Sequence, residues 1–466
     1  MTKLQRAEVV FFDLLAPTIS VSDPPNGEML ALGETTSGPS YSFAEILERF
    51  LLICALLLGV TTAAWCADYR VVYNFKSISS TPSSGLVIDA QGNAYGVTAE
   101  GGRANAGSVY VLSPTTGYHL LWPFSKGGPG GDNPQGNLLM DAAGNLYGTT
   151  VYGGRKDHDC AYDSCGVAFE LSPPSGGSGL WTETVLYTFC AESNCTDGAN
   201  PFSGLIFDAL GNLYGTTYVG GDSGDGVVFE LSPTSSGWKE SVLHSFQGAP
   251  HDGDFPFGGL IFDASGNLYG TTFTGGEYSG GLVFELSPSG SGWVETILHS
   301  LGADGDGFWP EAGLALDSQG DLYGTTAYGG NLTCAVDGCG VVFELKPTID
   351  GGWTESIIHT FGGGDGENPF ANVILDAAGN VYGTTQIGGG RGCSGVDGCG
   401  TVFKLTLESN GQRMETFLGL AGDAYGDLPN TPVILDSAGN IYGTASGGGA
   451  NSNGVVFRIT QWESND

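Results

Sequence analysis

From about residue 69 to residue 460, short runs rich in β-branched and aromatic residues alternate with clusters of Gly, Pro, Ser and Asn. The clearest unit extends from Gly258 to Leu301 and contains four such runs, GLIFD, NLYGTT, GLVFELS and WVETILHSL, which we call A to D. Their length, composition and flanking turn residues are typical of β-strands. Four short antiparallel strands of this kind form one blade of a β-propeller, so the pattern predicts an all-β fold.

This unit recurs along the chain. A D-[AS]-x-G-[ND]-x-Y-G element links runs A and B, and its copies begin at Asp89, Asp141, Asp208, Asp263, Asp317, Asp376 and Asp436. The last copy contains runs A to C only, whereas Tyr69–Phe75 resembles the D run Thr184–Phe189. We therefore expect a seven-bladed β-propeller over residues 68–466, in which the N-terminal strand closes the last blade and leaves no long open edge.

Most chemically capable residues recur at equivalent positions of the repeat, which favours structural roles. The Asp263 carboxylate is expected to accept backbone amides in the A–B turn, and Gly270 to let a neighbouring blade approach closely. Strand D begins with a tryptophan in four copies and carries a histidine at one shared position in three. These residues, interpreted as structural, are Trp181, Trp238, Trp293, Trp353, His244, His299 and His359.

Two segments precede the first repeat. Residues 1–45 are polar and lack a sustained period, so they are interpreted as a disordered leader or an overlong gene start. Residues 46–67 include the apolar run Phe50–Ala67, which predicts a signal peptide cleaved near Ala64 or Ala67, with a retained N-terminal membrane anchor as the alternative. Either interpretation predicts a secreted, periplasmic or cell-surface protein.

Eight of the ten cysteines form four close pairs, which are Cys160/Cys165, Cys190/Cys195, Cys334/Cys339 and Cys393/Cys399. Structural zinc sites usually combine two such pairs or add histidine, and these pairs are separated along the chain. We therefore expect four local disulfides. Disulfides form in an oxidising compartment, which agrees with the signal-like segment.

Charge excludes one class of partner. The chain has 15 Lys and Arg against 50 Asp and Glu, a formal net charge of −35. Such a surface repels phosphate backbones and anionic lipid headgroups, so we expect no nucleic acid and no membrane contact beyond the N-terminal anchor. A monomer is expected.

The B–C and D–A loops are expected on one face, since connections in an antiparallel meander alternate between its two ends. These loops vary in length and sequence, and variable loops on a rigid scaffold usually carry binding. The candidate binding residues are Trp309, which no other copy has at its position, and Arg155 and His158 in a charged loop. Packing beneath the loop and a solvated loop are their alternative interpretations.

Acidic Asp-Gly motifs gather in the same loops, at Asp197-Gly198, Asp252 to Asp254, Asp304 to Gly307, Asp365-Gly366 and Asp423 to Asp427. Calcium prefers clustered oxygen ligands, but none of these motifs fits the D-x-[DN]-x-[DN]-G pattern of a calcium loop. Turn chemistry is the favoured interpretation. No cofactor is therefore predicted, and calcium stays an alternative.

No G-x-S-x-G, H-E-x-x-H or P-loop motif occurs in the sequence. The 50 acidic residues still allow a pair of carboxylates of the kind that hydrolyses glycosides. The sequence predicts a non-enzymatic binding or scaffold module for an extracellular glycan or protein. The alternative is a carbohydrate-active or lactone-hydrolysing propeller with a central metal site. A metal in the central channel, held by Asp, Glu or Asn side chains that occur in single copies of the repeat, would favour the enzyme. The clearest such substitutions that we predict near the channel are Asn137, Ala312 and Asn372.

The string D-A-L-G-N-L-Y-G-T-T … G-V-V-F-E-L-S-P, from Asp208 to Pro233, resembles the GloVer-type tandem repeat of bacterial extracellular proteins, over about residues 69–460. The resemblance implies an exported repeat protein without an assigned biochemical role. It also implies a C-terminal sorting or anchoring segment in many members, which we do not expect after the last repeat here. The D-x-x-G-N-x-Y element is also similar to NHL-type propeller repeats. Neither resemblance supplies catalytic residues.

Overall fold

The computed structural model describes residues 67–77, 79–102, 104–154, 164–176, 179–290, 292–303, 305–330, 334, 337–389, 398–422, 424–460 and 462. The chain divides into two units, Met1–Ala64 and Trp65–Asp466, and every described residue belongs to the second. The predicted leader and, apart from Ala67, the predicted signal segment lie outside the described residues. No helix among the described residues is long and apolar enough to cross a membrane.

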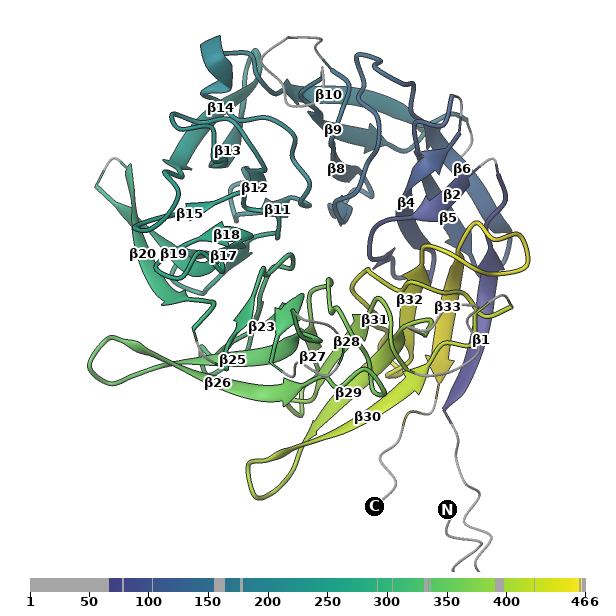
Figure 1. Cartoon of the computed structure of the whole chain (residues 1–466). Coiled ribbons are helices and arrows are strands. Elements are labelled where there is room, and N and C mark those ends of the chain that lie inside the picture. The colour runs from purple at the N-terminus through teal and green to yellow at the C-terminus, as the bar shows by residue number, and fades with distance from the viewer. Residues whose placement is uncertain are drawn as a thin grey trace, which may run out of the picture. The chain divides into compact units, whose positions relative to one another are not determined.

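The second unit is a seven-bladed β-propeller, as predicted, and its blades follow one another around a ring (Figure 1). The A strands are β3 (Val87–Ile88), β7 (Leu139–Met140), β11 (Ile206–Phe207), β16 (Ile261–Phe262), β22 (Ala315–Leu316), β27 (Ile374–Leu375) and β31 (Ile434–Leu435). The B strands are β4 (Ala94–Gly101), β8 (Leu146–Thr150), β12 (Leu213–Thr217), β17 (Leu268–Thr272), β23 (Leu322–Thr326), β28 (Val381–Thr385) and β32 (Ile441–Ala445).

The C and D strands complete each blade. The C strands are β5 (Ser108–Ser113), β9 (Val167–Ser172), β13 (Val227–Thr234), β19 (Leu282–Ser289), β25 (Val341–Pro347), β29 (Thr401–Leu407) and β33 (Val455–Thr460). The D strands are β6 (Gly117–Pro123), β10 (Thr182–Thr188), β14 (Gly237–Ser245), β20 (Gly292–Ser300), β26 (Trp353–Thr360), β30 (Arg413–Gly419) and β1 (Asp68–Asn74). Blades are numbered 1 to 7 in the order of their A strands.

Short elements decorate this frame. Strand β2 (Ser79–Pro82) extends the sheet of blade 1 by pairing with β4. Two small ribbons lie in the loops, β15 (Gly253–Asp254) with β18 (Thr274–Gly275) and β21 (Gly307–Phe308) with β24 (Tyr328–Gly329). One 3-10 turn, η1 (Ser193–Cys195), occurs in the D–A loop of blade 2.

The N-terminal strand closes the ring, which confirms the prediction from the incomplete last copy. Strand β1 pairs antiparallel with β33, from Asp68 opposite Thr460 to Asn74 opposite Val455. Phe75 follows β1, is fully buried, and donates its backbone N–H to Gly454 O at 3.0 Å. Blade 7 therefore combines strands from both ends of the propeller sequence.

Burial explains why the strands differ in composition. Strand β12 is buried at all five positions, whereas β14 has half-buried or exposed positions throughout. A B strand is covered by the blades on both sides, while a D strand faces the periphery. One ring from each C strand fills the blade core and is fully buried; these rings are Tyr110, Phe169, Phe229, Phe284, Phe343, Phe403 and Phe457.

The glycine that follows the repeated tyrosine has a different neighbour from the one predicted. A Cβ atom on Gly215 would lie 2.7 Å from Cζ of Phe229, which belongs to the facing C strand of the same blade. Gly270 has the same relation to Phe284, at 2.5 Å. The prediction of close approach was right, but it is made by the core ring of the same blade rather than by a neighbouring blade.

The A–B turn is held by its aspartate, as predicted. Asp208 Oδ1 accepts the backbone N–H groups of Leu210 and Asn212 at 2.8 and 2.9 Å. Its Oδ2 accepts Asn212 Nδ2 at 2.8 Å and the Tyr214 hydroxyl at 3.2 Å. Burial opposes ionisation of Asp208, but these hydrogen bonds outweigh it and lower the pKa of the carboxyl.

The tryptophans that open the D strands pack between blades, which confirms their structural interpretation. Trp293 of blade 4 meets the ring of Tyr214 in blade 3 edge-on, with centroids 6.3 Å apart. Trp353 makes the same contact with Tyr269 at 6.2 Å. In blade 6 the equivalent residue is Arg413, whose guanidinium lies 5.2 Å from the centroid of the Tyr323 ring. A cation–π contact therefore replaces a ring contact at one junction.

Candidate functional site

The D–A loops bring one proline from each blade to the start of its A strand, and the residue after this proline differs among the blades. We call these seven residues the entrance ring; they are Ser83, Gln135, Phe202, Phe257, Glu311, Phe370 and Asn430. All of them are half-buried. They line a cavity of about 580 Å³ at the mouth of the central channel, on the face that carries the B–C and D–A loops.

The backbone before each of these prolines takes a left-handed conformation. The residues concerned, with φ between +55° and +60°, are Thr81, Asn133, Asn200, Phe255, Trp309, Asn368 and Leu428. Asn200 shows how the bend is held, because its Nδ2 donates to Val151 O at 2.8 Å and to Ser164 O at 3.0 Å in the preceding blade. Non-glycine residues are held at positive φ only where the surroundings over-determine the backbone. The hydrogen bonds to the preceding blade, and not the entrance-ring residue, therefore set the backbone conformation at this bend.

A threonine on each of six B strands fixes the next entrance segment. Thr149 Oγ1 donates to Ser203 O at 2.7 Å, and Thr271 Oγ1 donates to Ala312 O at 2.7 Å. The remaining donors are Thr216, Thr325, Thr384 and Thr444. These inter-blade hydrogen bonds give a rigid rim on which the variable side chains stand.

Aromatic rings and amides share the lining of the cavity. The rings of Phe202 and Phe257 stack, with centroids 4.8 Å apart and planes inclined by 25°. Amide side chains come from Gln135, Gln386 and Asn430. The Asn430 Oδ1 atom is buried without a hydrogen-bond partner among the described residues. A buried acceptor of this kind is satisfied when a ligand supplies a donor.

Among the described residues that line this cavity, Glu311 is the one with a carboxylate. Burial raises the pKa of its carboxyl to about 7, because desolvation disfavours the charged form. Its negative charge also contributes to the raised pKa of the nearby Tyr328 hydroxyl, after the larger effect of burial. Near neutral pH, Glu311 can therefore either donate or accept a hydrogen bond.

Below the entrance the channel becomes apolar. A second cavity of about 450 Å³ is lined by A-strand residues such as Leu138, Leu314 and Val373. Asn137 and Asn372 border both cavities, but Asn137 Oδ1 accepts Gly85 N–H at 2.7 Å and Asn372 Oδ1 accepts Gly313 N–H at 3.0 Å. These two asparagines bridge neighbouring A strands.

The lining does not fit a central metal centre built from several carboxylates. Glu311 is its only acidic residue, and the described residues bring no group of three His, Cys, Asp or Glu side chains together at the entrance. The substitutions predicted from strand A were Asn137, Ala312 and Asn372. Asn137 and Asn372 do line the cavity, whereas Ala312 is not among its lining residues. The residue after the proline varies as well, with Phe in three blades and a different residue in each of the other four.

Of the three predicted binding residues, Trp309 is described and lies beside the entrance ring. Its indole is half-buried in an aromatic cluster, 5.4 Å by centroid from each of the rings of Phe273, Phe308 and Tyr328. Its backbone N–H donates to Gly280 O at 2.8 Å. Arg155 and His158 lie outside the described residues.

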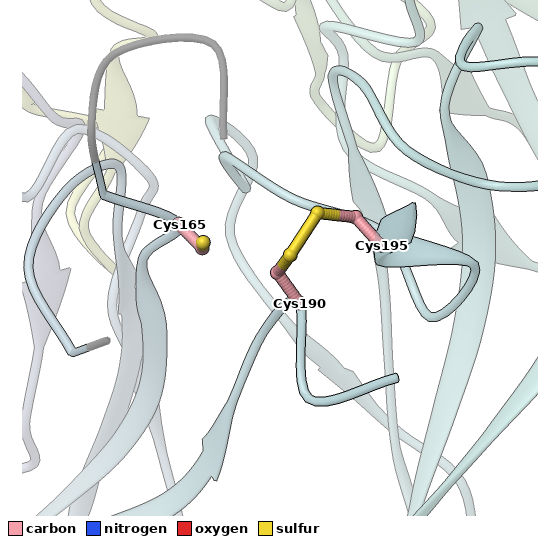
Figure 2. Close-up of side chains that lie close together, drawn as sticks. All are labelled: Cys165, Cys190 and Cys195. Atoms are coloured by element: carbon pink, nitrogen blue, oxygen red, sulfur yellow. A yellow bond between two sulfur atoms is a disulfide. The ribbon is translucent and has the colours of Figure 1, made fainter. Parts of the chain in front are cut away.

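Two of the predicted disulfides are present, Cys190–Cys195 and Cys334–Cys339. Cys165 and Cys399 are disulfide-bonded as well, while their predicted partners Cys160 and Cys393 lie outside the described residues. Figure 2 shows the Cys165 sulfur next to the Cys190–Cys195 bridge, which joins the two ends of a D–A loop turn. The disulfides are compatible with an oxidising compartment.

The histidines of strand D are structural in position, yet each has two acidic neighbours. His244 lies next to Asp252 of its own D–A loop and Glu295 of the next blade. Burial would lower the pKa of His244, but the Asp252 hydrogen bond and the charges of Glu295 and Asp252 raise it. Asp252 also accepts the backbone N–H groups of Gln247 and Gly253, at 2.9 and 2.6 Å, which supports the turn interpretation of its Asp-Gly motif.

Sequence reasoning selected the aspartate partners of these histidines in the Asp-Gly motifs but missed Glu311 and the glutamate partners. The signal for Glu311 was available, because the residue after the repeated proline is Phe in three copies and polar or charged in the other four. The glutamates were hidden for the opposite reason. Glu240, Glu295 and Glu355 stand two residues after the tryptophan of strand D and look like ordinary exposed strand residues.

Comparison with a family model gives three overlapping matches to the Gloeobacter/Verrucomicrobia repeat, at residues 60–261, 161–396 and 337–465. Together these matches span the whole propeller. No curated protein matches the chain.

Solved structures with a similar chain path are enzymes of low identity. A luciferin-regenerating enzyme is 12% identical, covers 85% of this chain and 96% of its own, and has a TM-score of 0.44. A candidate 6-phosphogluconolactonase from Bacteroides uniformis is 14% identical, with 73% and 84% coverage and a TM-score of 0.45. A glucose dehydrogenase is 13% identical, with 84% and 99% coverage and a TM-score of 0.43. Such values transfer no activity to this chain.

Proposed function

This chain belongs to the Gloeobacter/Verrucomicrobia repeat family, and from that premise we propose that it is a non-enzymatic binding propeller whose central entrance takes an extracellular carbohydrate. The entrance ring carries the proposal. Six blades supply a repeated threonine that anchors the rim, while the residue after the proline is Phe in three blades and a different residue in each of the other four. Variable residues on a repeated frame usually carry binding, so we assign the specificity of the protein to this lining.

The chemistry of the lining favours a sugar. Carbohydrates present apolar ring faces and many hydroxyl groups, and sites for polar ligands combine aromatic surface with a few placed polar groups. The stacked rings of Phe202 and Phe257 provide the apolar surface. The Asn430 amide and the Glu311 carboxyl provide acceptors for hydroxyl donors. The cavity of about 580 Å³ has room for one or two sugar rings.

Location follows from the same proposal. Disulfides in several loops suit a protein exported to an oxidising space, where extracellular glycans occur. We propose a secreted, periplasmic or cell-surface protein that acts as a monomer. Fractionation of the native host, followed by immunodetection and sedimentation, tests both statements.

The binding test uses the purified full chain on a glycan array, followed by calorimetry with the oligosaccharide that binds best. Phe257→Ala removes half of the aromatic stack and is expected to weaken binding about tenfold or more, a loss of about 1.4 kcal/mol or more. Phe417→Ala is the matched control, because Phe417 is an exposed ring on the outer strand β30. Equal affinity in the two variants would contradict the proposal.

An activity assay tests the alternative that the protein is an enzyme. We expect no turnover of aryl-glycosides, esters or lactones, with or without calcium. Sustained turnover that Glu311→Gln abolishes would replace the binding proposal by the enzyme, with Glu311 as its acid or base.

A further inference from the structure

Each junction between neighbouring blades places a residue near the end of one D strand against a residue near the start of the next. Five of these junctions have a buried or half-buried glutamate on the second strand, and these residues are Glu183, Glu240, Glu295, Glu355 and Glu415. Three of the five also have a histidine on the first strand and an aspartate from the D–A loop. These three groups are His244/Asp252/Glu295, His299/Asp306/Glu355 and His359/Asp365/Glu415, which we call the junction triads.

The three side chains of a junction triad converge on one point. His244 Nε2 lies 3.3 Å from Asp252 Oδ2 and 3.6 Å from Glu295 Oε2. The equivalent distances are 3.1 and 3.5 Å in the second triad and 3.3 and 3.5 Å in the third. Nitrogen and oxygen ligands at about 2.0–2.2 Å from a tetrahedral metal ion lie about 3.4 Å from one another. The spacing of the triad atoms is that of a ligand set.

The charges of a triad are incompletely balanced by the described residues. The side chains of Asp252 and Glu295 are only 9% and 14% exposed. When both carboxyl groups are ionised, a proton on the imidazole of His244 neutralises one of them and leaves the other. In the same triad Glu295 Oε1 is buried without a hydrogen-bond partner among the described residues, and so are Glu355 Oε1 and Glu415 Oε1 in the other two. A dication held between a neutral imidazole and two carboxylates would leave no net charge.

The junction between blades 2 and 3 shows what the histidine adds. There Tyr187 takes the place of the histidine, and its hydroxyl donates to Asp197 Oδ2 at 2.7 Å. Glu240 takes the place of the triad glutamate, and its Oε1 is likewise buried without a partner. The glutamate and the aspartate are thus common to both kinds of junction. The histidine completes a set of three metal-ligating groups at the junction triads.

We propose that each of the three junction triads binds one transition-metal dication, with Zn²⁺ as the probe, and that the ion joins adjacent blades. Imidazole together with carboxylates suits zinc and its neighbours, whereas calcium and magnesium prefer oxygen alone. Three protein ligands leave a further coordination position for water. At the first triad, His251 lines the same cavity of about 370 Å³ as His244, Asp252 and Glu295 and is available for that position.

The test measures zinc stoichiometry. The purified full chain, with its disulfides intact, is dialysed against a chelator and titrated with Zn²⁺ by calorimetry and elemental analysis. We expect three equivalents, two after Glu295→Gln, and none after the combined Glu295→Gln, Glu355→Gln and Glu415→Gln changes. Glu240→Gln is the matched control and keeps three equivalents, because its junction has no histidine. Ca²⁺ should not compete.

A second measurement guards against loss of folding. Zn²⁺ should raise the Tm of the wild type, because an ion that bridges two blades binds the folded state only. It should leave the Tm of the triple variant unchanged, and far-ultraviolet circular dichroism should show that this variant is folded. Fewer than three equivalents in the wild type, or equal binding in the wild type and the triple variant, would overturn the proposal.

Discussion

At one end of the blades, the A–B turns repeat the same aspartate and glycine, with asparagine in six turns and Asp321 in the fifth, and the aspartate that opens each turn accepts backbone amides of its own turn. At the other end, the residue after the entrance proline is Phe in three blades and a different residue in each of the other four. The two ends are joined by the same strands. The difference teaches that a repeat can keep its repeated and its variable residues in separate places, with the turn end stabilising the blade and the entrance end carrying the proposed specificity.

The acidic residues at the two ends of the blades differ in the direction of their pKa shifts. Hydrogen bonds lower the pKa of Asp208 at the turn end, although burial opposes them. Burial raises the pKa of Glu311 at the entrance end to about 7. A carboxylate that prefers the charged form in the fold stabilises it, and one that prefers the neutral form destabilises it when ionised. Four predictions follow this contrast, from the largest effect to the smallest.

Removing residues 69–75 should have the largest effect, because both ends of the blades depend on a closed ring. The deletion takes away the β1 ladder on β33 and the buried Phe75 ring. We expect a loss of about 5 kcal/mol or more, measured by denaturant unfolding. Hydrogen exchange should report the loss first in β31 to β33. An unchanged unfolding midpoint would show that closure does not support the ring.

The change Asp208→Ala tests the turn end. It removes the acceptor of four hydrogen bonds and should cost about 3 kcal/mol at pH 7, while ligand affinity at the entrance stays the same. The contribution of the ionised carboxyl is present above the unfolded pKa of about 3.9 and is lost as the pH falls through the lower folded value. Urea unfolding at pH 7 and pH 2.5 measures this difference. A variant that loses affinity but not stability would reverse the assignment of the two ends.

Removing the Cys190–Cys195 disulfide tests how much the stability of a D–A loop depends on a bond within that loop. Replacing both cysteines by serine should cost about 2 kcal/mol, because a short loop gains little chain entropy when it opens. Hydrogen exchange should rise in η1 and stay constant in the A–B turn of blade 3. Equal changes at both ends of the blade would show that the ends are not independent.

The change Glu311→Gln should have the smallest effect and the opposite sign. The folded pKa is above the usual value of 4.5, so the penalty for ionisation is absent below about pH 4.5, grows between pH 4.5 and 7, and is constant above pH 7. The full shift corresponds to about 3 kcal/mol, but water and side-chain movement stabilise a half-buried charge, so the variant should be more stable than the wild type by only about 1 kcal/mol at pH 8 and equally stable at pH 4. A variant that is less stable at pH 8 would mean that the charge of Glu311 is stabilised in the fold.

Repetition decided what could be predicted from the sequence. The seven blades, the closing strand and the role of the turn aspartate all follow from residues that recur, because recurrence reveals a shared environment. The partner of Gly270 was predicted wrongly, since a glycine pattern indicates a close approach without saying which strand makes it. Trp309 was selected because no other copy has a tryptophan at its position, whereas Glu311 two residues later lines the cavity.

The junction triads were beyond sequence reasoning for a geometrical reason. His244 and Glu295 are half-buried on strands of neighbouring blades, and the distance between them depends on the angle at which the blades are set. Each residue taken singly is an unremarkable member of a strand. Only the stacking of one blade on the next brings the imidazole and the carboxylate together.

The pairing of β1 with β33 also sets the order of events during synthesis. Tyr69 lies opposite Ile459, about 390 positions later in the chain, so β1 leaves the ribosome long before its partner exists. Blades 1 to 6 need only local contacts and can form as they emerge, whereas blade 7 must bring distant segments together and pay a loop-closure entropy that local blades avoid. We therefore expect the closing of the ring to be the slowest step of folding, and blade 7 to complete its sheet only after β33 has been made.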